Sequence, residues 1–359
     1  MTRSTMFQEL RGWSTGTLMV ALSACSACGR GNGAPPTTPS PYLPLVLVAD
    51  VGLPGGATRF DYQEIDAAQA HLVVAHMNDA SVLVLNLGDG SVAKLLPGIP
   101  TPRGVAVGND VGRIFVTSSP SQLVIVDNQS LVEIGRVATG NGPDGVGYDP
   151  VDRVVAVSDQ HDGAVSLIAG AGSGQRTQVA LGTETGNVVF DAGRRAFWAA
   201  VVTASPPDQL AAIDPVTATV TTRIDLPGCT GAHGVRLHPD GQSAFVACEG
   251  NDVLARVDLG GAHAVVTSPT GSGPDVLSVD PGLGWLYMAA ESGDLTVFDI
   301  RQPGLVAIDR EHPGDAAHSV AVDPATHRVF FPLVAGPGGT PVLRIMRPKS
   351  LPSAAPSGS

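Results

Sequence analysis

The chain of 359 residues carries a formal net charge of −12, with 44 glycines, 29 prolines, 43% hydrophobic residues and only 15% charged ones. It contains no cluster of lysine and arginine that could neutralise phosphates, which argues against nucleic acid as a partner. The hydrophobic content suffices for a large core, and the many glycines and prolines favour numerous short strands and turns.

The first 25 residues have the features of an export signal. Arg3 and Arg11 supply positive charge, and the mostly apolar run 13–24 is too short to span a bilayer. The run ends in LSAC, which resembles the bacterial lipobox, where the cysteine becomes the lipidated first residue of the mature chain. We therefore expect a lipoprotein signal over 1–25 with lipidation at Cys25. The alternative is an ordinary cleaved signal with a coincidental cysteine.

A segment rich in proline and glycine, 26–43, follows this signal and is typical of a flexible tether. We expect the tether to hold the globular part off a membrane, so that the lipid is the only membrane contact. The chain is thus predicted to be exported and membrane-anchored, either in the periplasm or on the cell surface. At the other end, 349–359 is expected to be a disordered tail.

Between these ends the sequence repeats. One pattern, clearest in "TPRGVAVGNDVGRIFVTSS" from Thr101 onward, recurs at steps of 42, 41, 42, 47, 42 and 43 residues. The equivalent positions are Tyr62, Gly104, Gly145, Asn187, Gly234, Val276 and Ser319. A period of this length with four strands per unit is typical of a β-propeller blade.

The predicted fold is therefore all-β, a seven-bladed β-propeller over 44–348 with four-stranded blades. The last unit lacks an outer strand, whereas 44–51 has the character of an outer strand with no inner strand before it. We expect this N-terminal strand to complete the seventh blade, because closing the ring removes exposed sheet edges. A closed propeller is expected to be a monomer.

One repeat contains the glycine spacing of a dinucleotide-binding loop, G-x-G-x-x-G, at Gly140, Gly142 and Gly145. That motif indicates a nucleotide site only between a strand and a helix. Here two short runs of alternating and β-branched residues follow, separated by Asp149-Pro150, which predicts strands. We interpret the motif as the loop that leads into the innermost strand of one blade.

Two cysteines in the repeats are candidates for a disulfide. Cys229 precedes one inner strand and Cys248 ends the hairpin partner of that strand, so both lie at the same end of the hairpin. In an oxidising compartment a disulfide is the expected outcome. Two unpaired buried thiols or a metal pair are the alternatives.

Inner strands of the type P-x-G-V-A-V-D-P followed by R-V-F-V resemble the YVTN-repeat β-propellers of bacteria. The resemblance covers 45–347, and "TPRGVAV…GRIFVTS" and "PDGVGYDPVDRVVAVS" are its closest copies. It implies an exported, often surface-tethered repeat protein. It says little about activity, since the fold hosts binding proteins, lyases and hydrolases alike.

In such a propeller the loops into the inner strands converge at the mouth of the central channel. The residue before each repeat position is expected there, and six of the seven are polar: Asp61, Arg103, Asp144, His233, Asp275 and His318. We expect them to bind a small molecule or a protein, and the Arg103 guanidinium suits a carboxylate. Glu249, Asp159 and Glu291 fall in equivalent loops after the second strands and could line the same mouth, but we favour their interpretation as solvated turn residues.

Three consecutive blades contribute His233, Asp275 and His318, two imidazoles and a carboxylate that could bind Zn²⁺ or a similar ion. Exported propeller lyases with rings of histidine ligands use such a geometry. The same residue types also cap strands and line wet channels without any metal. The leading hypothesis is a binding module with no catalytic residue and no required cofactor. The alternative is a metal-dependent lyase or hydrolase that uses a divalent transition metal.

Overall fold

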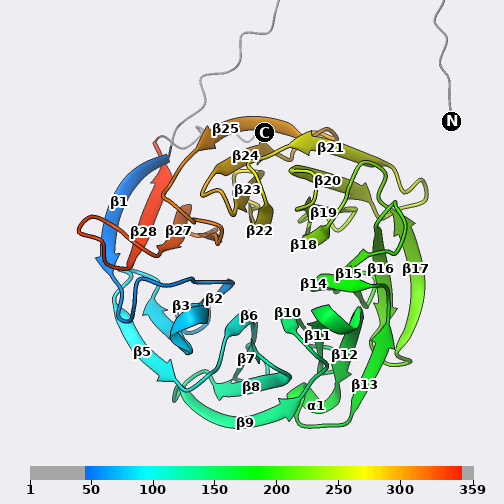
Figure 1. Cartoon of the computed structure of the whole chain (residues 1–359), viewed down its shortest axis with the longest axis horizontal. Helices are drawn as coiled ribbons and strands as arrows, with labels where there is room; N and C mark the ends of the chain where they lie inside the picture. The colour runs from blue at the N-terminus through cyan, green and yellow to red at the C-terminus, as the bar shows by residue number, and fades with distance from the viewer. Residues whose placement is uncertain (1–44, 350–359) are drawn as a thin grey trace, which may run out of the picture. The chain divides into compact units, whose positions relative to one another are not determined.

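The computed structural model describes residues 45–349, which form a closed ring of seven four-stranded antiparallel sheets (Figure 1). The predicted seven-bladed propeller is confirmed. The signal over 1–25 with Cys25, the tether over 26–43 and the tail beyond Lys349 lie outside the described residues. Within 45–349 no helix is long and apolar enough to cross a membrane.

The blades are numbered one to seven in chain order, and each of the first six runs outward from the centre of the ring. The innermost strands are β2 (Gln63–Asp66), β6 (Pro102–Gly108), β10 (Pro143–Asp149), β14 (Glu184–Asp191), β18 (Ala232–Leu237), β22 (Pro274–Asp280) and β26 (Ala321–Asp323). The second strands are β3 (His71–His76), β7 (Arg113–Ser118), β11 (Val154–Asp159), β15 (Ala196–Val202), β19 (Ser243–Cys248), β23 (Trp285–Ala290) and β27 (Arg328–Leu333).

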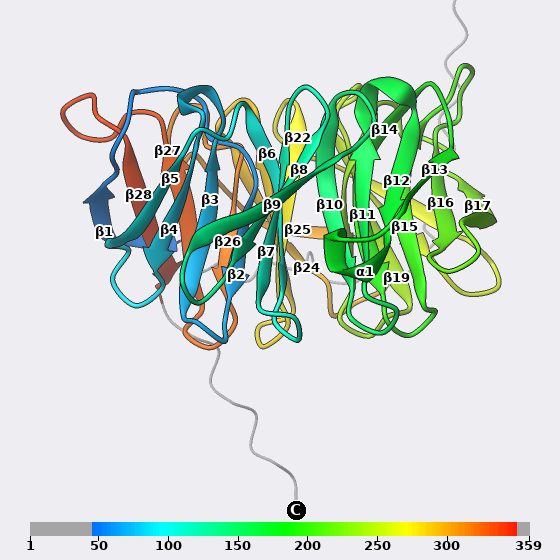
Figure 2. The ribbon, with the colours of Figure 1, turned by 90° about the horizontal axis from the view of Figure 1, so that it is seen from below.

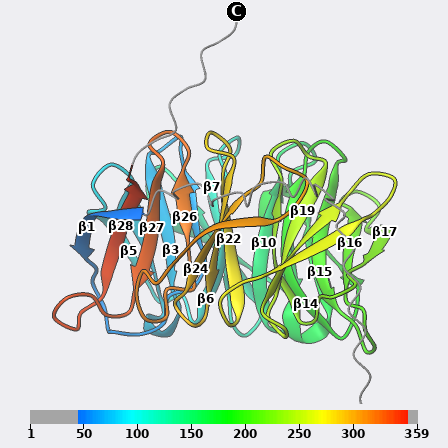
Figure 3. The same ribbon diagram turned by 90° about the horizontal axis from the view of Figure 1, so that it is seen from above.

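The third strands are β4 (Ser81–Asn86), β8 (Gln122–Asp127), β12 (Ala164–Ile168), β16 (Gln209–Asp214), β20 (Val253–Asp258), β24 (Leu295–Asp299) and β28 (Val342–Pro348). The outer strands are β5 (Val92–Pro97), β9 (Val132–Ala138), β13 (Arg176–Ala180), β17 (Thr219–Asp225), β21 (Val265–Pro269), β25 (Val306–Glu311) and β1 (Leu45–Gly52). Short helical turns are η1 (Met77–Asp79), η2 (Gln160–Asp162) and α1 (Ala169–Gly172). Two side views show the strands running between the two faces of the ring, where the loops gather (Figures 2 and 3).

The strands owe their composition to their place in the blade. Every residue of β11, β19 and β23 is buried, because a second strand is covered on both faces by the neighbouring blades. Their sequences are accordingly near-continuous apolar runs. The outer strands instead mix exposed and half-buried positions, as in β9. The core therefore consists of apolar layers between blades, for example Tyr287 of blade six with Phe331 of blade seven.

The ring closes through the N-terminal strand, as predicted. β1 pairs antiparallel with β28 in a register that runs from Leu45–Pro348 to Gly52–Val342, one residue beyond the expected 44–51. Arg344 in β28 donates from Nε and Nη2 to the two carboxylate oxygens of Asp50 in β1, at 2.8 and 2.7 Å. The seventh blade is thus built from both ends of the described chain.

The innermost strands approach one another so closely that several repeat positions need glycine. A Cβ atom added to Gly104 would lie 2.3 Å from the carbonyl oxygen of Asp144, and one added to Gly145 would lie 2.1 Å from Asn187 Oδ1. Gly145 lies inside β10, so a strand and not a helix follows the first two glycines of the G-x-G-x-x-G motif. The interpretation of that motif as the entry to an inner strand is confirmed.

Cys229 and Cys248 form a disulfide, with Cα atoms 5.3 Å apart, as the hairpin geometry predicted. Both residues are buried. The bridge ties the loop before β18 to the end of β19, and this loop leads directly to His233. The disulfide therefore fixes one side of the channel mouth.

Candidate functional site

All six predicted residues lie at one end of the channel, where the innermost strands begin. Arg103, Asp144, His233 and Asp275 are the second residues of their strands, and Asp61 and His318 lie in the loops just before theirs. Five of them are buried: Asp61, Asp144, His233, Asp275 and His318. The remaining one of the seven equivalent positions is Gly186, in blade four, which has no side chain to contribute. The six residues thus lie together at the mouth, as expected from their equivalent positions in the repeats. The contacts among their side chains define the chemistry of the site.

Asp275, from blade six, lies at the centre of this cluster. The hydroxyl of Tyr62 donates to Asp275 Oδ1 at 2.8 Å. His233 Nε2 is 3.7 Å from the same oxygen, and Arg59 Nη2 is 3.9 Å from Oδ2. Asp275 therefore links side chains from the first, fifth and sixth blades.

Asp144, from blade three, is the second centre. Arg103 Nη1 donates to its Oδ1 at 3.3 Å, and His233 Nε2 lies 3.3 Å from its Oδ2. Arg103 Nη1 also donates to Gln160 Oε1 at 3.2 Å. Arg103, which the sequence suggested as a partner for an anionic ligand, is thus already engaged by a carboxylate of the protein.

Sequence reasoning missed two members of the cluster, Arg59 and Tyr62, and named Glu249 and Glu291 only as weaker candidates for the mouth. Arg59 donates to both carboxylate oxygens of Glu291, at 2.9 and 2.6 Å. Glu249 Oε1 lies 3.7 Å from His233 Nε2, and both glutamates are 39% exposed. Both side chains are partly exposed, as expected of turn residues, and each also faces the charged groups of the mouth.

The third residue of that loop set, Asp159, behaves differently. It accepts hydrogen bonds from Gly140 N at 2.8 Å, Ser166 Oγ at 2.6 Å and Gln178 Nε2 at 3.0 Å. These partners belong to its own blade and to the loop before it, so Asp159 serves the blade and not the mouth. Asp159 is the last residue of β11, whereas Glu249 and Glu291 follow the last residues of β19 and β23. Their counterpart in blade three is therefore Gln160 and not Asp159.

Burial and the crowding of carboxylates shift the pKa values of the cluster. Burial, followed by the charges of Asp144 and Asp275, raises the pKa of Asp61 well above its usual value. Burial opposes protonation of His233, but the carboxylates of Asp144, Glu249 and Asp275 outweigh it and raise its pKa to about 9. Burial raises the pKa of Glu249 to about 7. The carboxylates therefore stabilise a positive charge at the mouth.

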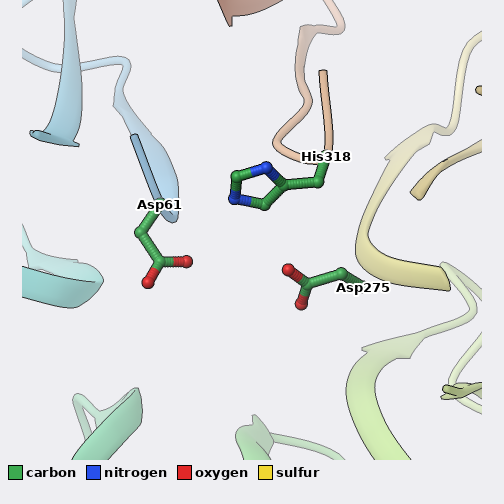
Figure 4. A group of neighbouring side chains, drawn as sticks. All are labelled: Asp61, Asp275 and His318. Atoms are coloured by element: carbon green, nitrogen blue, oxygen red, sulfur yellow. The ribbon is translucent and has the colours of Figure 1, made fainter. Parts of the chain in front are cut away.

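Two sets of side chains have the spacing of metal ligands. Within the described residues, Asp61, Asp275 and His318 each offer a ligand atom, and these atoms lie within 4.8 Å of one another. His233, Glu249 and Asp275 form a second such set. Figure 4 shows Asp61, Asp275 and His318 pointing toward one another from three directions. Asp275 is shared, but the two imidazoles that the sequence combined belong to different sets.

Below the mouth the channel contains an open cavity of about 240 Å³. Its wall is made by the innermost strands and mixes apolar side chains such as Val105, Val146 and Val188 with polar ones such as Gln63 and Asn187. Tyr62 is the member of the charged cluster that borders it. At the level of Glu64 and Arg236, which form an ion pair at 3.3 Å, the lining becomes charged again. Charged side chains thus occur both at the mouth and at this second level of the channel.

Comparison with known proteins supports the fold. The structure is similar to a chain of hydrazine synthase from Kuenenia stuttgartiensis, with a TM-score of 0.70 over 84% of this chain and 98% of that one. The two sequences are 16% identical, so the similarity shows the propeller fold alone. No protein-family model and no curated protein matches the sequence.

Proposed function

We propose that this propeller is a binding module that takes a small, positively charged ligand at the mouth of its channel. One observation carries the proposal, the surplus of carboxylates there. Five carboxylates face three cationic groups, which leaves up to two negative charges for a bound cation to neutralise. Without such a cation protons reduce this surplus, because the pKa values of Asp61 and Glu249 are raised. The carboxylates are Asp61, Asp144, Asp275, Glu249 and Glu291, and the cationic groups are Arg59, Arg103 and His233.

The burial of the site supports a small ligand. Asp61, Asp144 and Asp275 are almost fully buried, and a buried carboxylate without a full complement of cations is costly. A ligand that brings one or two positive charges among them would offset that cost. A protein surface could reach Glu249 and Glu291 at the rim, but it could not reach the buried carboxylates without inserting a side chain.

The module is proposed to act outside the cytoplasm, anchored by a lipid on Cys25 and monomeric. The LSAC sequence, the tether composition and the resemblance to YVTN-repeat propellers support this placement. The Cys229–Cys248 disulfide is consistent with an oxidising compartment. In this proposal the lipid is the only contact with a membrane.

The proposal is tested by thermal shift and calorimetry on the full chain, purified from an exporting host. Methylguanidinium and putrescine serve as cationic probes, and acetate serves as an anionic one. A ligand that binds only the folded state raises the unfolding temperature with its concentration. We expect a shift with the cations that is lost in Asp61→Asn. Asp240→Asn removes the same charge from an exposed turn beside His238 and should keep the shift. Stabilisation by acetate alone would contradict the proposal.

A further inference from the structure

His318 has one ring nitrogen without a partner in a buried position. The residue is 2% exposed, and its Nδ1 lies 3.1 Å from the backbone carbonyl oxygen of Ala316. A carbonyl oxygen only accepts hydrogen bonds, so Nδ1 carries the proton and Nε2 presents a lone pair. That Nε2 atom is buried and has no hydrogen-bond partner in the structure.

The unpartnered side of the imidazole is directed at two carboxylates. His318 offers its ligand atom within 4.8 Å of those of Asp61 and Asp275, and Figure 4 shows the ring turned toward Asp61 across the channel mouth. When the imidazole is neutral and both carboxylates are ionised, all three groups are acceptors, so none of them can donate a hydrogen bond to another. A cation between them would satisfy all three.

We propose that Asp61, Asp275 and His318 bind one divalent transition metal ion, of the class of Zn²⁺ and Mn²⁺. The proposal rests on the proposed function, since the ion would be the positively charged ligand of the mouth. One imidazole and two carboxylates suit both ions, whereas Ca²⁺ and Mg²⁺ prefer oxygen donors alone. Three protein ligands would leave further coordination positions open toward the mouth.

The groups around the three ligands have the arrangement expected of a metal site. Metal-binding histidines almost always donate their other ring N–H to a carbonyl or carboxylate, as His318 does to Ala316. The Tyr62 hydroxyl holds Asp275 at Oδ1, and the backbone N–H of Asp61 donates to the carbonyl of Ala75 at 2.9 Å. The side chains of His318 and Asp275 are therefore oriented, and the backbone of Asp61 is held in place, before any ion arrives.

The second set, with His233 and Glu249, lacks this signature. His233 Nε2 already faces the carboxylates of Asp144, Glu249 and Asp275 at 3.3, 3.7 and 3.7 Å. It does not present a buried nitrogen without a partner. Geometry thus favours the set around His318 over the His233–Asp275–His318 combination that the sequence suggested.

The test measures metal binding by the full chain after treatment with a chelator. Zn²⁺ and Mn²⁺ are titrated in competition with a fluorescent chelator, and metal content is measured by mass spectrometry. We expect one ion per chain, with Zn²⁺ bound more tightly than Mn²⁺. His318→Ala should weaken Zn²⁺ binding at least about 100-fold, and Tyr62→Phe, which removes a supporting hydrogen bond, about 10-fold.

His327→Ala is the matched control, because His327 pairs with Asp280 at the opposite ends of the hairpins, far from the mouth. This variant should bind Zn²⁺ with full affinity. Asp61→Asn, nearly isosteric, is the second ligand variant in case His318→Ala does not fold. X-ray absorption of the Zn²⁺ form should show a single imidazole ligand. A larger loss in His233→Ala than in His318→Ala, or binding that His318→Ala leaves intact, would overturn the proposal.

The same preparation separates this inference from the proposed function. If methylguanidinium binds and neither metal ion does, the metal site is refuted and the cation-binding function stands. If neither the organic cation nor a metal ion binds, both are refuted. Stoichiometric Zn²⁺ that depends on His318 and Asp61 supports both.

Discussion

His233 Nε2 lies 3.3 Å from Asp144 Oδ2, although these residues belong to blades five and three and a whole blade separates them. Blade four makes the contact possible because Gly186 stands at the equivalent position without a side chain. A Cβ atom there would lie 2.5 Å from both the Cα and the carbonyl oxygen of His233. The mouth is therefore asymmetric, because the side chains of His233 and Asp144 meet above Gly186.

The Gly186→Ala substitution should destabilise the protein and disturb the mouth. The new methyl group meets backbone atoms of His233, which cannot move without shifting β18, so we expect a loss of about 1–3 kcal/mol in unfolding free energy. Urea unfolding measures it. Gly135→Ala in β9, where an added Cβ meets nothing within 4 Å, should stay within about 0.5 kcal/mol of the wild type. Equal losses in the two variants would contradict the close-approach argument.

Removal of the Cys229–Cys248 bridge should lower stability by about 3 kcal/mol. The bridge closes a loop with a sequence separation of 19 residues, and cross-linking such a loop restricts the unfolded chain by roughly that amount. The Cys229→Ala, Cys248→Ala double variant, compared with the oxidised wild type by chemical denaturation, measures the effect. Reductant should destabilise the wild type and leave the double variant unchanged. If reductant affected both alike, the bridge would not be the cause.

Stability should fall on acidification because of His76. This residue is fully buried, stacks on Phe60 with ring centroids 4.1 Å apart, and contacts Thr58 at 3.1 Å. Burial lowers its pKa below the ordinary 6.5, so the unfolded chain binds the proton more readily than the folded one. Stability is then present above pH 6.5 and is lost as the pH falls below that value, by at most about 1.4 kcal/mol per pH unit for one proton.

Urea unfolding at pH values from 8 to 5 measures this dependence. His76→Gln should show a smaller loss between pH 6.5 and 5, and the difference between variant and wild type at pH 8 gives the cost of the substitution itself. An unchanged pH dependence in His76→Gln would assign the acid sensitivity to other groups.

The Asp50–Arg344 pair should contribute to closing the ring. The two side chains form a bidentate contact across β1 and β28 and are 15% and 22% exposed. A double-mutant cycle of Asp50→Ala and Arg344→Ala should give a coupling energy of about 1 kcal/mol that decreases at high salt. A coupling energy of zero would mean that hydrogen bonding of the strands alone closes the seventh blade.

Most of the fold was predictable because the sequence pattern of one blade repeats along the chain. Equivalent residues such as Gly104 and Gly145 recur at a nearly constant step, and the unpaired strand character of 44–51 located the closure to within one residue. The disulfide was predictable because Cys229 and Cys248 lie at the same end of one hairpin. Each of these inferences needs only local pattern and topology.

The site was predictable at the level of backbone position and not of side-chain direction. Asp61, Asp275 and His318 converge because every inner strand starts at the same face. The meeting of Tyr62 with Asp275, 213 positions apart, depends on the curvature of the ring and on rotamers. The direction of the Glu249 side chain, toward His233, depends on the same factors. No local sequence pattern distinguishes it from a solvated loop residue.

The register that joins Leu45 to Pro348 also bears on how the chain reaches its native state. These partners are 303 positions apart (348 − 45), so their pairing has a very high contact order and cannot form before β28 exists. Until β1 arrives, β28 presents an unpaired edge on which another chain could add a strand. We therefore expect ring closure to be the slow and aggregation-prone step of folding, and the hydrogen bonds of Arg344 to Asp50 to favour β1 over a foreign strand at that edge.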